Sequence, residues 1–237
     1  MIGPTGRTPA GTSPAGSRPD GATQDAPLID ACLRLILVTD GIGDATRLQQ
    51  IVTAAIEGGV RCVQLREPRW SARQLLLACE ILKPMLDSVH GLLLVNDRLD
   101  VAATGAAHGA QIGHRSLPPE LARKVVGPSS VLGYSAHNAA EMSLAAKHGC
   151  DFALLSPVWP TSSKPSVAPL EVSRAAQLTE QAPLPIAWLG GVNPTTIHQI
   201  QDVAESQRPV GVAVLSAIMQ SDDPKTTAAQ LLASCPS

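Results

Sequence analysis

The sequence predicts an α/β fold, a single (β/α)8 TIM barrel behind a disordered N-terminal tail. Short apolar runs alternate with longer stretches of helical periodicity, roughly one pair every 25 residues. Eight such pairs follow one another along the chain. The core has to be aliphatic, because 44% of the residues are hydrophobic but only 2% are aromatic. Aliphatic strands of this kind are typical of parallel sheets that are buried on both faces.

The first 28 residues differ in composition from the rest of the chain. They are rich in Gly, Pro, Ser and Thr and contain few large apolar residues. Such a segment buries too little apolar surface to offset the entropy lost on ordering. We therefore divide the chain into a disordered leader, residues 1–28, and a barrel domain, residues 29–237. A transit peptide is the minor alternative for the leader, which lacks helical amphipathicity.

The predicted strands are 33–38, 60–65, 91–95, 109–112, 131–134, 152–155, 185–189 and 210–215. The predicted helices are 44–57, 72–88, 98–105, 118–126, 139–148, 170–181, 194–205 and 224–233. Asp44, Ser71 and Asn193 are placed to cap helix N-termini. A doubly wound open sheet is the alternative architecture. The count of eight, with no GxGxxG or GxxxxGK[ST] fingerprint, favours the closed barrel.

The composition also limits the classes of partner that the protein can bind. A formal net charge of −2 provides no general attraction to nucleic acid or to an anionic membrane. No apolar stretch is long enough to span a bilayer, and the N-terminus has no signal-peptide core. The five cysteines are scattered, which argues against a zinc site or a disulfide framework. We expect a cytoplasmic protein whose ligands are small molecules, and the sequence leaves open whether it forms a homo-oligomer.

Polar residues gather where the predicted strands end, and in a (β/α)8 barrel these ends form the face that carries the site. Arg66 follows one strand, with Gln64 two residues earlier on the same side. A guanidinium can hold a phosphate through two parallel hydrogen bonds. The alternative is that Arg66 pairs with Glu67 or a neighbouring carboxylate to close the barrel mouth.

Asn96 and Asp97 end the next strand. A carboxylate and an amide at one strand end can hold a hard cation such as Mg²⁺ against a diphosphate. Asp97 would serve equally well as the N-cap of the helix predicted from residue 98. The residues at this strand end are therefore consistent with two interpretations, a metal site and a helix cap.

The segment 156–164 is a polar loop after the sixth strand. The hydroxyls of Thr161 and Ser163 and the ammonium of Lys164 could surround an anionic group. A lysine at a barrel mouth also raises a Schiff-base aldolase. Because Lys164 lies well outside the strand, an anion clamp is the better interpretation.

Gly190 and Gly191 follow the seventh strand, and Ser216 ends the eighth. Backbone N–H groups at this position of a barrel commonly bind a phosphate. The alternative is that the glycines relieve crowding at a turn. His114 and His137, after the fourth and fifth strands, are candidates for an acid or base or for a structural hydrogen bond.

With these segments assembled, the chain resembles the thiamine phosphate synthases and the related thiazole tautomerases. The matching segments are LILVTD (35–40), VQLRE (63–67), LVNDRLDVA (94–102), QIGHRSLP (111–118), LGYSAHN (132–138), SPVWPTSSK (156–164), WLGGVNP (188–194) and GVAVLSAI (211–218). They occur in the family's order and cover nearly everything from Leu35 onward. The resemblance implies a transferase that joins an aminopyrimidine diphosphate to a thiazole phosphate with release of pyrophosphate.

The resemblance also implies roles for residues at the matching positions. Four side chains would hold the diphosphate: Gln64, Arg66, Asn96 and Lys164. Asp97 would bind Mg²⁺. Ser135, Thr161 and Ser163 would add hydrogen bonds, and the backbones of Gly191 and Ser216 would hold the thiazole phosphate. Among these, Arg66, Lys164 and Ser135 would be the catalytic residues.

The chain departs from the family pattern at two positions of the diphosphate site. Pro68 stands where the family usually has a lysine, and Arg69 beside it is a candidate replacement. Ser116 stands where the family has a second magnesium carboxylate. These departures keep two alternatives open, a thiazole-phosphate tautomerase-like isomerase and a barrel that binds a phosphorylated ligand without catalysis. Pro157, where the tautomerases carry a histidine, weighs against the isomerase.

Overall fold

The computed structural model describes residues 26–163 and 165–235, with side chains from residue 29 onward. The predicted leader, residues 1–28, lies outside this description except for the backbone of residues 26–28. The predicted anion-binding Lys164 also lies outside the described residues.

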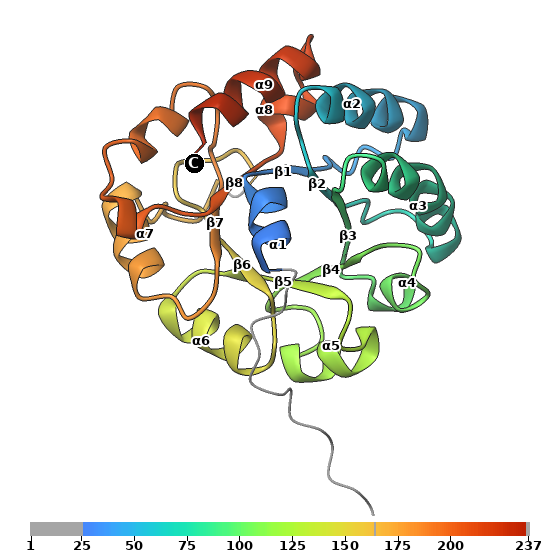
Figure 1. The fold of residues 1–237 in the computed structure, drawn as a ribbon, viewed down its shortest axis with the longest axis horizontal. Coiled ribbons are helices and arrows are strands. Elements are labelled where there is room, and N and C mark those ends of the chain that lie inside the picture. Colours follow the sequence, from blue (N-terminus) through green and yellow to red (C-terminus); the bar gives the residue numbers. More distant parts are fainter. Residues whose placement is uncertain (1–25, 164, 236–237) are drawn as a thin grey trace, which may run out of the picture.

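Eight parallel strands form a barrel that closes on itself in the order of the sequence (Figure 1). The strands are β1 (Leu35–Val38), β2 (Cys62–Leu65), β3 (Leu92–Asn96), β4 (Gly109–Ile112), β5 (Val131–Ala136), β6 (Phe152–Leu155), β7 (Ile186–Leu189) and β8 (Gly211–Val214). The barrel closes where Leu35 of β1 pairs with Val212 of β8. The predicted fold class is confirmed, and every predicted strand ends within two residues of the observed one.

Helices surround the barrel, as the predicted alternation requires (Figure 1). They are α2 (Ala45–Glu57), α3 (Ala72–Asp87), α4 (Leu99–Ala103), α5 (Pro119–Val126), α6 (Ala139–Lys147), α7 (Val172–Glu180) and α9 (Pro224–Ser234). The Asp44 carboxylate accepts a hydrogen bond from the N–H of Arg47 at 3.0 Å and so caps α2. Ser71 and Gln74 form a capping box on α3. These two predicted caps are confirmed, and each satisfies a backbone donor that the helix itself cannot. The third, Asn193, accepts from the N–H groups of Thr195 and Thr196, but the α-helix that it was predicted to cap does not form.

Helix α1 (Ala26–Leu33) was not predicted. It begins inside the segment assigned to the leader, and it lies across the centre of the barrel when the molecule is viewed along the barrel axis (Figure 1). Its residues Ile29, Cys32 and Leu33 pack against side chains of the barrel interior, including Ile36 and Phe152. Because α1 leads directly into β1, it closes the N-terminal end of the barrel. The apolar residues at 29, 32 and 33 have helical spacing, which could have revealed this helix.

The prediction of an α-helix over residues 194–205 is wrong. This segment contains two short 3₁₀ helices, η1 (Ile197–Ile200) and η2 (Glu205–Gln207). Ile197 and Ile200 are both buried, and a spacing of three residues places them on one side of a 3₁₀ turn. The guanidinium of Arg208 donates to the carbonyls of Gln201 and Val203, and the α-helix would need the Gln201 carbonyl for the amide of Glu205. A further short helix, α8 (Ser216–Met219), follows β8 and was not predicted.

The barrel interior changes from apolar to polar along its axis. Ile36, Cys62, Phe152 and Ala213 belong to the apolar cluster that α1 covers. Closer to the C-terminal ends of the strands, the interior contains the buried polar residues Gln64, Gln111 and Ser156. The fold therefore has a closed apolar bottom and a polar mouth, which is where the sequence places its candidate site.

Candidate active site

The predicted site residues come together at the mouth of the barrel. All eight strands are parallel, so the residues that follow them lie on the same side of the molecule. The described candidates there are Gln64, Arg66, Asn96, Asp97, Ser135, Thr161, Ser163, Gly191 and Ser216. Four buried side-chain polar atoms have no hydrogen-bond partner among the described residues: Gln64 Oε1, Glu67 Oε2, Gln111 Oε1 and Ser156 Oγ. All four belong to strands or strand ends at this mouth, where a bound polar molecule could supply the missing partners.

Arg66 is half-buried, and its guanidinium forms no hydrogen bond or ion pair with any residue that the structure describes. The alternative pairing of Arg66 with Glu67 is wrong, because the carboxylate of Glu67 instead accepts a hydrogen bond from Thr39 Oγ1 at 2.9 Å. Thr39 Oγ1 also accepts from the backbone N–H of Arg66 at 2.8 Å. The threonine thus fixes the backbone where the arginine emerges, while the guanidinium stays available for an anion.

Glu67 is 5% exposed, and burial raises the pKa of its carboxyl group. The hydrogen bond from Thr39 lowers the pKa in opposition, as do the amides of Gly41 and Gly43, and the charge of Asp40 raises it further. Asp40 is itself paired with Arg47 at 2.9 Å. Neither carboxylate neutralises Arg66, so the mouth keeps a positive charge beside β2.

Gln64 and Asn96 are linked across β2 and β3. The side-chain Nε2 of Gln64 donates to Oδ1 of Asn96 at 2.7 Å. This contact uses one of the two amide hydrogens of Gln64 and leaves its buried Oε1 without a partner among the described residues. The two residues that were predicted to hold one ligand therefore lie in contact at adjacent strand ends.

Asp97 does not cap the helix that follows it. The N-terminal residue of α4 is preceded by Arg98, and no side chain caps this end of the described helix. Asp97 is exposed and has a φ of 62°, an uncommon conformation for a residue other than glycine. Its Oδ1 accepts a hydrogen bond from Ser116 Oγ, and its Oδ2 lies 3.5 Å from Nδ2 of Asn96. The helix-cap alternative is thus wrong, and the carboxylate stays at the rim of the mouth.

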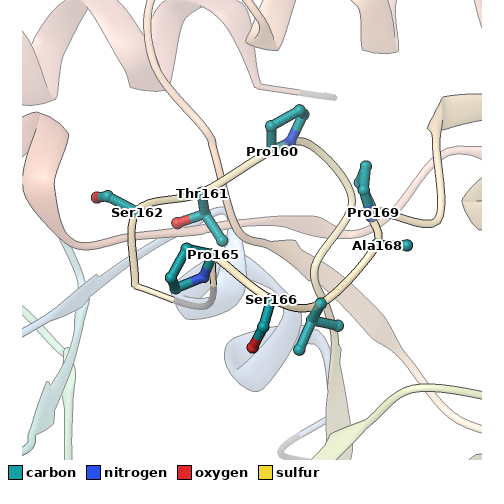
Figure 2. Close-up of a pocket in the computed structure, with 8 residues that line it drawn as sticks. Pro160, Thr161, Ser162, Pro165, Ser166, Ala168 and Pro169 are labelled. Carbon is teal, nitrogen blue, oxygen red and sulfur yellow. The ribbon is translucent and has the colours of Figure 1, made fainter.

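The loop after β6 folds back on itself between residues 160 and 169 and surrounds a cavity of about 430 Å³. Figure 2 shows Thr161, Ser162, Pro165 and Ser166 on the segments that border this cavity. Thr161 Oγ1 accepts a hydrogen bond from the backbone N–H of Ser163 at 3.3 Å. The two predicted hydroxyl residues are therefore neighbours within one polar turn.

Gly190 and Gly191 bring the end of β7 against the loop that follows β6. Their φ values are 96° and 72°, which side chains other than glycine adopt with strain. A Cβ atom on Gly190 would lie 2.7 Å from Cβ of Pro157, and one on Gly191 would lie 2.5 Å from the carbonyl oxygen of Pro160. The crowding alternative for these glycines is therefore correct in part, since the chain needs glycine here whether or not a phosphate binds. Ser216 is exposed at the first position of α8.

His114 and His137 form an edge-to-face pair at the rim, with ring centroids 6.2 Å apart. His137 is held by Glu141, whose Oε2 lies 3.0 Å from Nδ1 and accepts from the His137 backbone N–H at 2.8 Å. Burial alone would raise the pKa of Glu141, but these contacts with His137 lower it. The structure thus supports a structural contact for His137.

Some contacts of the mouth were not predicted. Gln111, on β4, donates a hydrogen bond to Ser135 at 3.1 Å. Arg69, a candidate replacement for the missing lysine, donates instead to the carbonyls of Gly41 and Ile42 at 3.0 and 2.7 Å. A glutamine within an otherwise apolar strand was a signal that could have pointed to Gln111. The contact of Arg69 depends on how two loops pack, and the sequence contains no signal for it.

None of the helices in the described part of the chain is long and apolar enough to cross a membrane. The fold and the polar mouth together define a (β/α)8 barrel of the kind that carries an enzyme site at the C-terminal ends of its strands.

Comparison with known proteins identifies the family. Residues 35–218 match the family model described as thiamine monophosphate synthase. The chain is 39% identical over 205 residues to the thiamine-phosphate synthase of Thermobifida fusca, covering 84% of this chain and 90% of the relative. It is 35% identical over 204 residues to a putative thiamine-phosphate synthase of Geobacter sulfurreducens, covering 85% and 94%. The chain belongs to the thiamine monophosphate synthase family.

The fold agrees with solved structures. The thiamine phosphate pyrophosphorylase from Pyrococcus furiosus superposes with a TM-score of 0.76 at 24% identity, over 87% of this chain and 96% of that one. At this identity the likeness supports the fold alone. The predicted family and barrel are both confirmed.

Proposed function

We propose that this chain forms thiamine phosphate at the C-terminal mouth of its barrel. Its family membership makes it a transferase enzyme of thiamine biosynthesis. In the proposed reaction the bond between the pyrimidinylmethyl carbon and the diphosphate oxygen breaks, and pyrophosphate leaves with the electron pair. The thiazole nitrogen of the second, phosphorylated substrate then forms the new C–N bond. Negative charge develops on the leaving group, so positive charge placed beforehand is the main catalytic device.

The observation that carries this proposal is the guanidinium of Arg66, which has no hydrogen bond or ion pair with a described residue. It is half-buried at the mouth, and no described carboxylate neutralises it, although Glu67 is the next residue. A guanidinium held in this state can bind the diphosphate and stabilise the charge that develops on it. Gln64 and Asn96, in contact on the adjacent strands, would bind the same group.

The remaining contacts with substrates are assigned by position. Ser135, Thr161 and Ser163 would donate hydrogen bonds to the diphosphate, and the charge of Lys164 would help to bind it. The backbones of Gly191 and Ser216, after β7 and β8, would hold the thiazole phosphate. Since Arg69 is bound to the loop after β1, the charge missing at Pro68 is not replaced from that side.

Mg²⁺ fits the residues at the rim only if the substrate completes its coordination. Within the described residues, no group of three His, Cys, Asp or Glu side chains is assembled as a metal site. Asp97 offers one exposed carboxylate, with Asn96 beside it. A hard cation that keeps several waters and binds phosphate oxygens suits one protein carboxylate. When bound, Mg²⁺ would neutralise charge on the departing pyrophosphate.

The test is to incubate purified protein with the aminopyrimidine diphosphate and the thiazole phosphate, in Mg²⁺ and in EDTA. Thiamine phosphate that forms only with Mg²⁺ supports both the reaction and the metal. Product formed equally in EDTA would contradict the metal assignment. Binding of the thiazole phosphate without product would contradict the synthase and support the ligand-binding alternative.

A further inference from the structure

Gln111 lies inside the barrel, where only 1% of its surface is exposed. Its Nε2 donates a hydrogen bond to Oγ of Ser135 at 3.1 Å. Gln111 pairs with Gly133 in the β4–β5 register, and Ser135 is two residues farther along β5. The buried amide of Gln111 thus contacts the hydroxyl of Ser135, which lies closer to the mouth.

The same arrangement occurs between β2 and β3. Gln64 pairs with Leu94 in the register and donates to Asn96, two residues farther along β3. Leu94 in turn pairs with Gly109 of β4, and Gln111 lies two residues farther along that strand. In a barrel of eight strands with a shear of 8, an interior layer advances by one residue per strand, so Gln64 and Gln111 lie in the same layer. Alternate strands contribute the side chains of one interior layer in a barrel of this type. Two glutamines of one layer therefore each support one polar side chain of the layer above.

Stability does not account for Gln111. Its Oε1 is buried and has no hydrogen-bond partner among the described residues. An unpartnered buried carbonyl opposes folding, and an apolar side chain of similar length would avoid this penalty. A residue that is unfavourable for packing at this depth needs another reason to be there.

Gly133 leaves room beside it for one end of the Gln111 amide. A Cβ atom on Gly133 would lie 2.1 Å from Oε1 of Gln111 and 2.4 Å from Cζ of Phe152. The carbonyl end of the amide lies against the glycine, and the NH₂ end donates to Ser135. A serine hydroxyl has one hydrogen, and its oxygen here accepts from Gln111, so the hydrogen remains available to another acceptor.

We propose that Gln111 is a positioning residue, which holds the Ser135 hydroxyl with its hydrogen directed to an oxygen of the bound diphosphate. If the amide were reversed, Ser135 would donate to Oε1 and could not donate to the ligand. The proposal rests on the proposed function, because it takes the diphosphate as the ligand of Ser135.

A double-mutant cycle with pyrophosphate tests this proposal without requiring turnover. The proteins are the wild type, Gln111→Met, Ser135→Ala and the double variant, and calorimetry measures the affinity for pyrophosphate in the presence of Mg²⁺. Gln111→Met and Ser135→Ala should each weaken binding by roughly tenfold, and the double variant should bind no more weakly than Ser135→Ala. Leu154→Met is the control. Leu154 lies two residues beyond Phe152, the residue of β6 in register with Gly133, and so belongs to the same interior layer as Gln111. This variant should bind pyrophosphate as the wild type does.

Thermal melts of all variants show whether each one folds. If Gln111→Met weakened binding equally with and without Ser135, its effect would be structural and the proposal would be overturned. Unchanged affinity in Gln111→Met would overturn it as well, and so would a wild type that does not bind pyrophosphate. A wild type that binds pyrophosphate with the expected non-additivity but makes no thiamine phosphate would contradict the proposed function and leave the role of Gln111 intact.

Discussion

Ser116 donates its hydroxyl hydrogen to the carboxylate of Asp97, which links the loop after β4 to the end of β3. Ser116 Oγ also accepts from the backbone N–H of Gly113 at 2.7 Å. The serine stands where the family resemblance places a second carboxylate. At the ends of β3 and β4 the rim therefore has one carboxylate held by a neutral hydroxyl, in place of two carboxylates that could share a cation.

We expect Asp97→Asn to lower the rate of thiamine phosphate formation by about 100-fold, because the variant loses the single carboxylate available to Mg²⁺. Asparagine keeps the size of the side chain and tolerates the φ of 62° that Asp97 adopts. Steady-state rates over a range of Mg²⁺ concentrations measure the effect. The control is Asp100→Asn. Asp100 lies on α4, and its exposed carboxylate pairs with Arg98. Equal rates for Asp97→Asn and the wild type at every Mg²⁺ concentration would remove Asp97 from the metal site.

Arg66→Lys should lower the turnover rate by roughly 100-fold, although the charge is retained. An ammonium cannot form the two parallel hydrogen bonds with which a guanidinium holds a phosphate group. Rates at saturating concentrations of both substrates separate this effect from weaker binding. Arg73→Lys, on the exposed surface of α3, is the matched control and should behave as the wild type. A wild-type rate in Arg66→Lys would show that only the charge matters.

Arg123 joins α5 to the segments that lead into β5 and β6, and its loss should destabilise the barrel. Its guanidinium donates to the carbonyls of Gly127, Ser130 and Gly149 and pairs with Asp151 at 2.8 Å. We expect Arg123→Met to lower the free energy of unfolding by about 2–4 kcal/mol, because several partly buried oxygen atoms would lose their hydrogen-bond donor.

Urea denaturation measures this loss. The neighbouring Lys124→Met removes only an exposed ion pair with Glu120 and should change stability by less than about 1 kcal/mol. Similar effects of the two variants would show that the contacts of Arg123 contribute little.

His108 should make the fold less stable in mild acid. Its Nδ1 accepts from the backbone N–H of Leu93 at 2.9 Å, which requires the neutral ring. Burial lowers the pKa of His108 from 6.5, and the charge of Lys83 lowers it further, while Asp87 opposes both. The unfolded chain therefore takes up the proton at a higher pH than the folded chain does. The stability contributed by the neutral ring is present above pH 6.5 and is lost as the pH falls below it.

Urea denaturation between pH 7.5 and 5.5 measures this dependence. His108→Gln removes the titrating group, so its stability should vary less with pH over the same range. If both proteins lost the same stability in acid, another group would be responsible.

Much of the fold could be predicted because its signals are local. The alternation of short apolar runs with helical segments reports each strand and helix separately, and Asp44 and Ser71 cap helices within three residues of themselves. The segment after β7 was predicted wrongly for the opposite reason. Pro194 and the apolar spacing around Ile197 suit an α-helix locally, but Arg208 binds the Gln201 carbonyl that the helix would need.

The residues of the mouth could be predicted for a different reason. Every strand of a closed parallel barrel ends on the same side, so a polar residue that follows a strand lies at the mouth of the barrel. Arg66 and Asp97 were placed at this mouth from their positions in the chain. The family resemblance, confirmed by the match over residues 35–218, added the reaction that they serve.

The sequence by itself determined the barrel, the family and the face that carries the site, because periodicity and the order of motifs are properties of the chain. Only the tertiary structure decided which polar atoms meet: Ser116 with Asp97, Gln111 with Ser135, and Arg69 with the loop after β1. These partners lie 19, 24 and 28 positions apart in the chain. Hydrogen bonds require their donors and acceptors to lie within about 3 Å of each other, and at such separations the strand register and the loop packing set that distance.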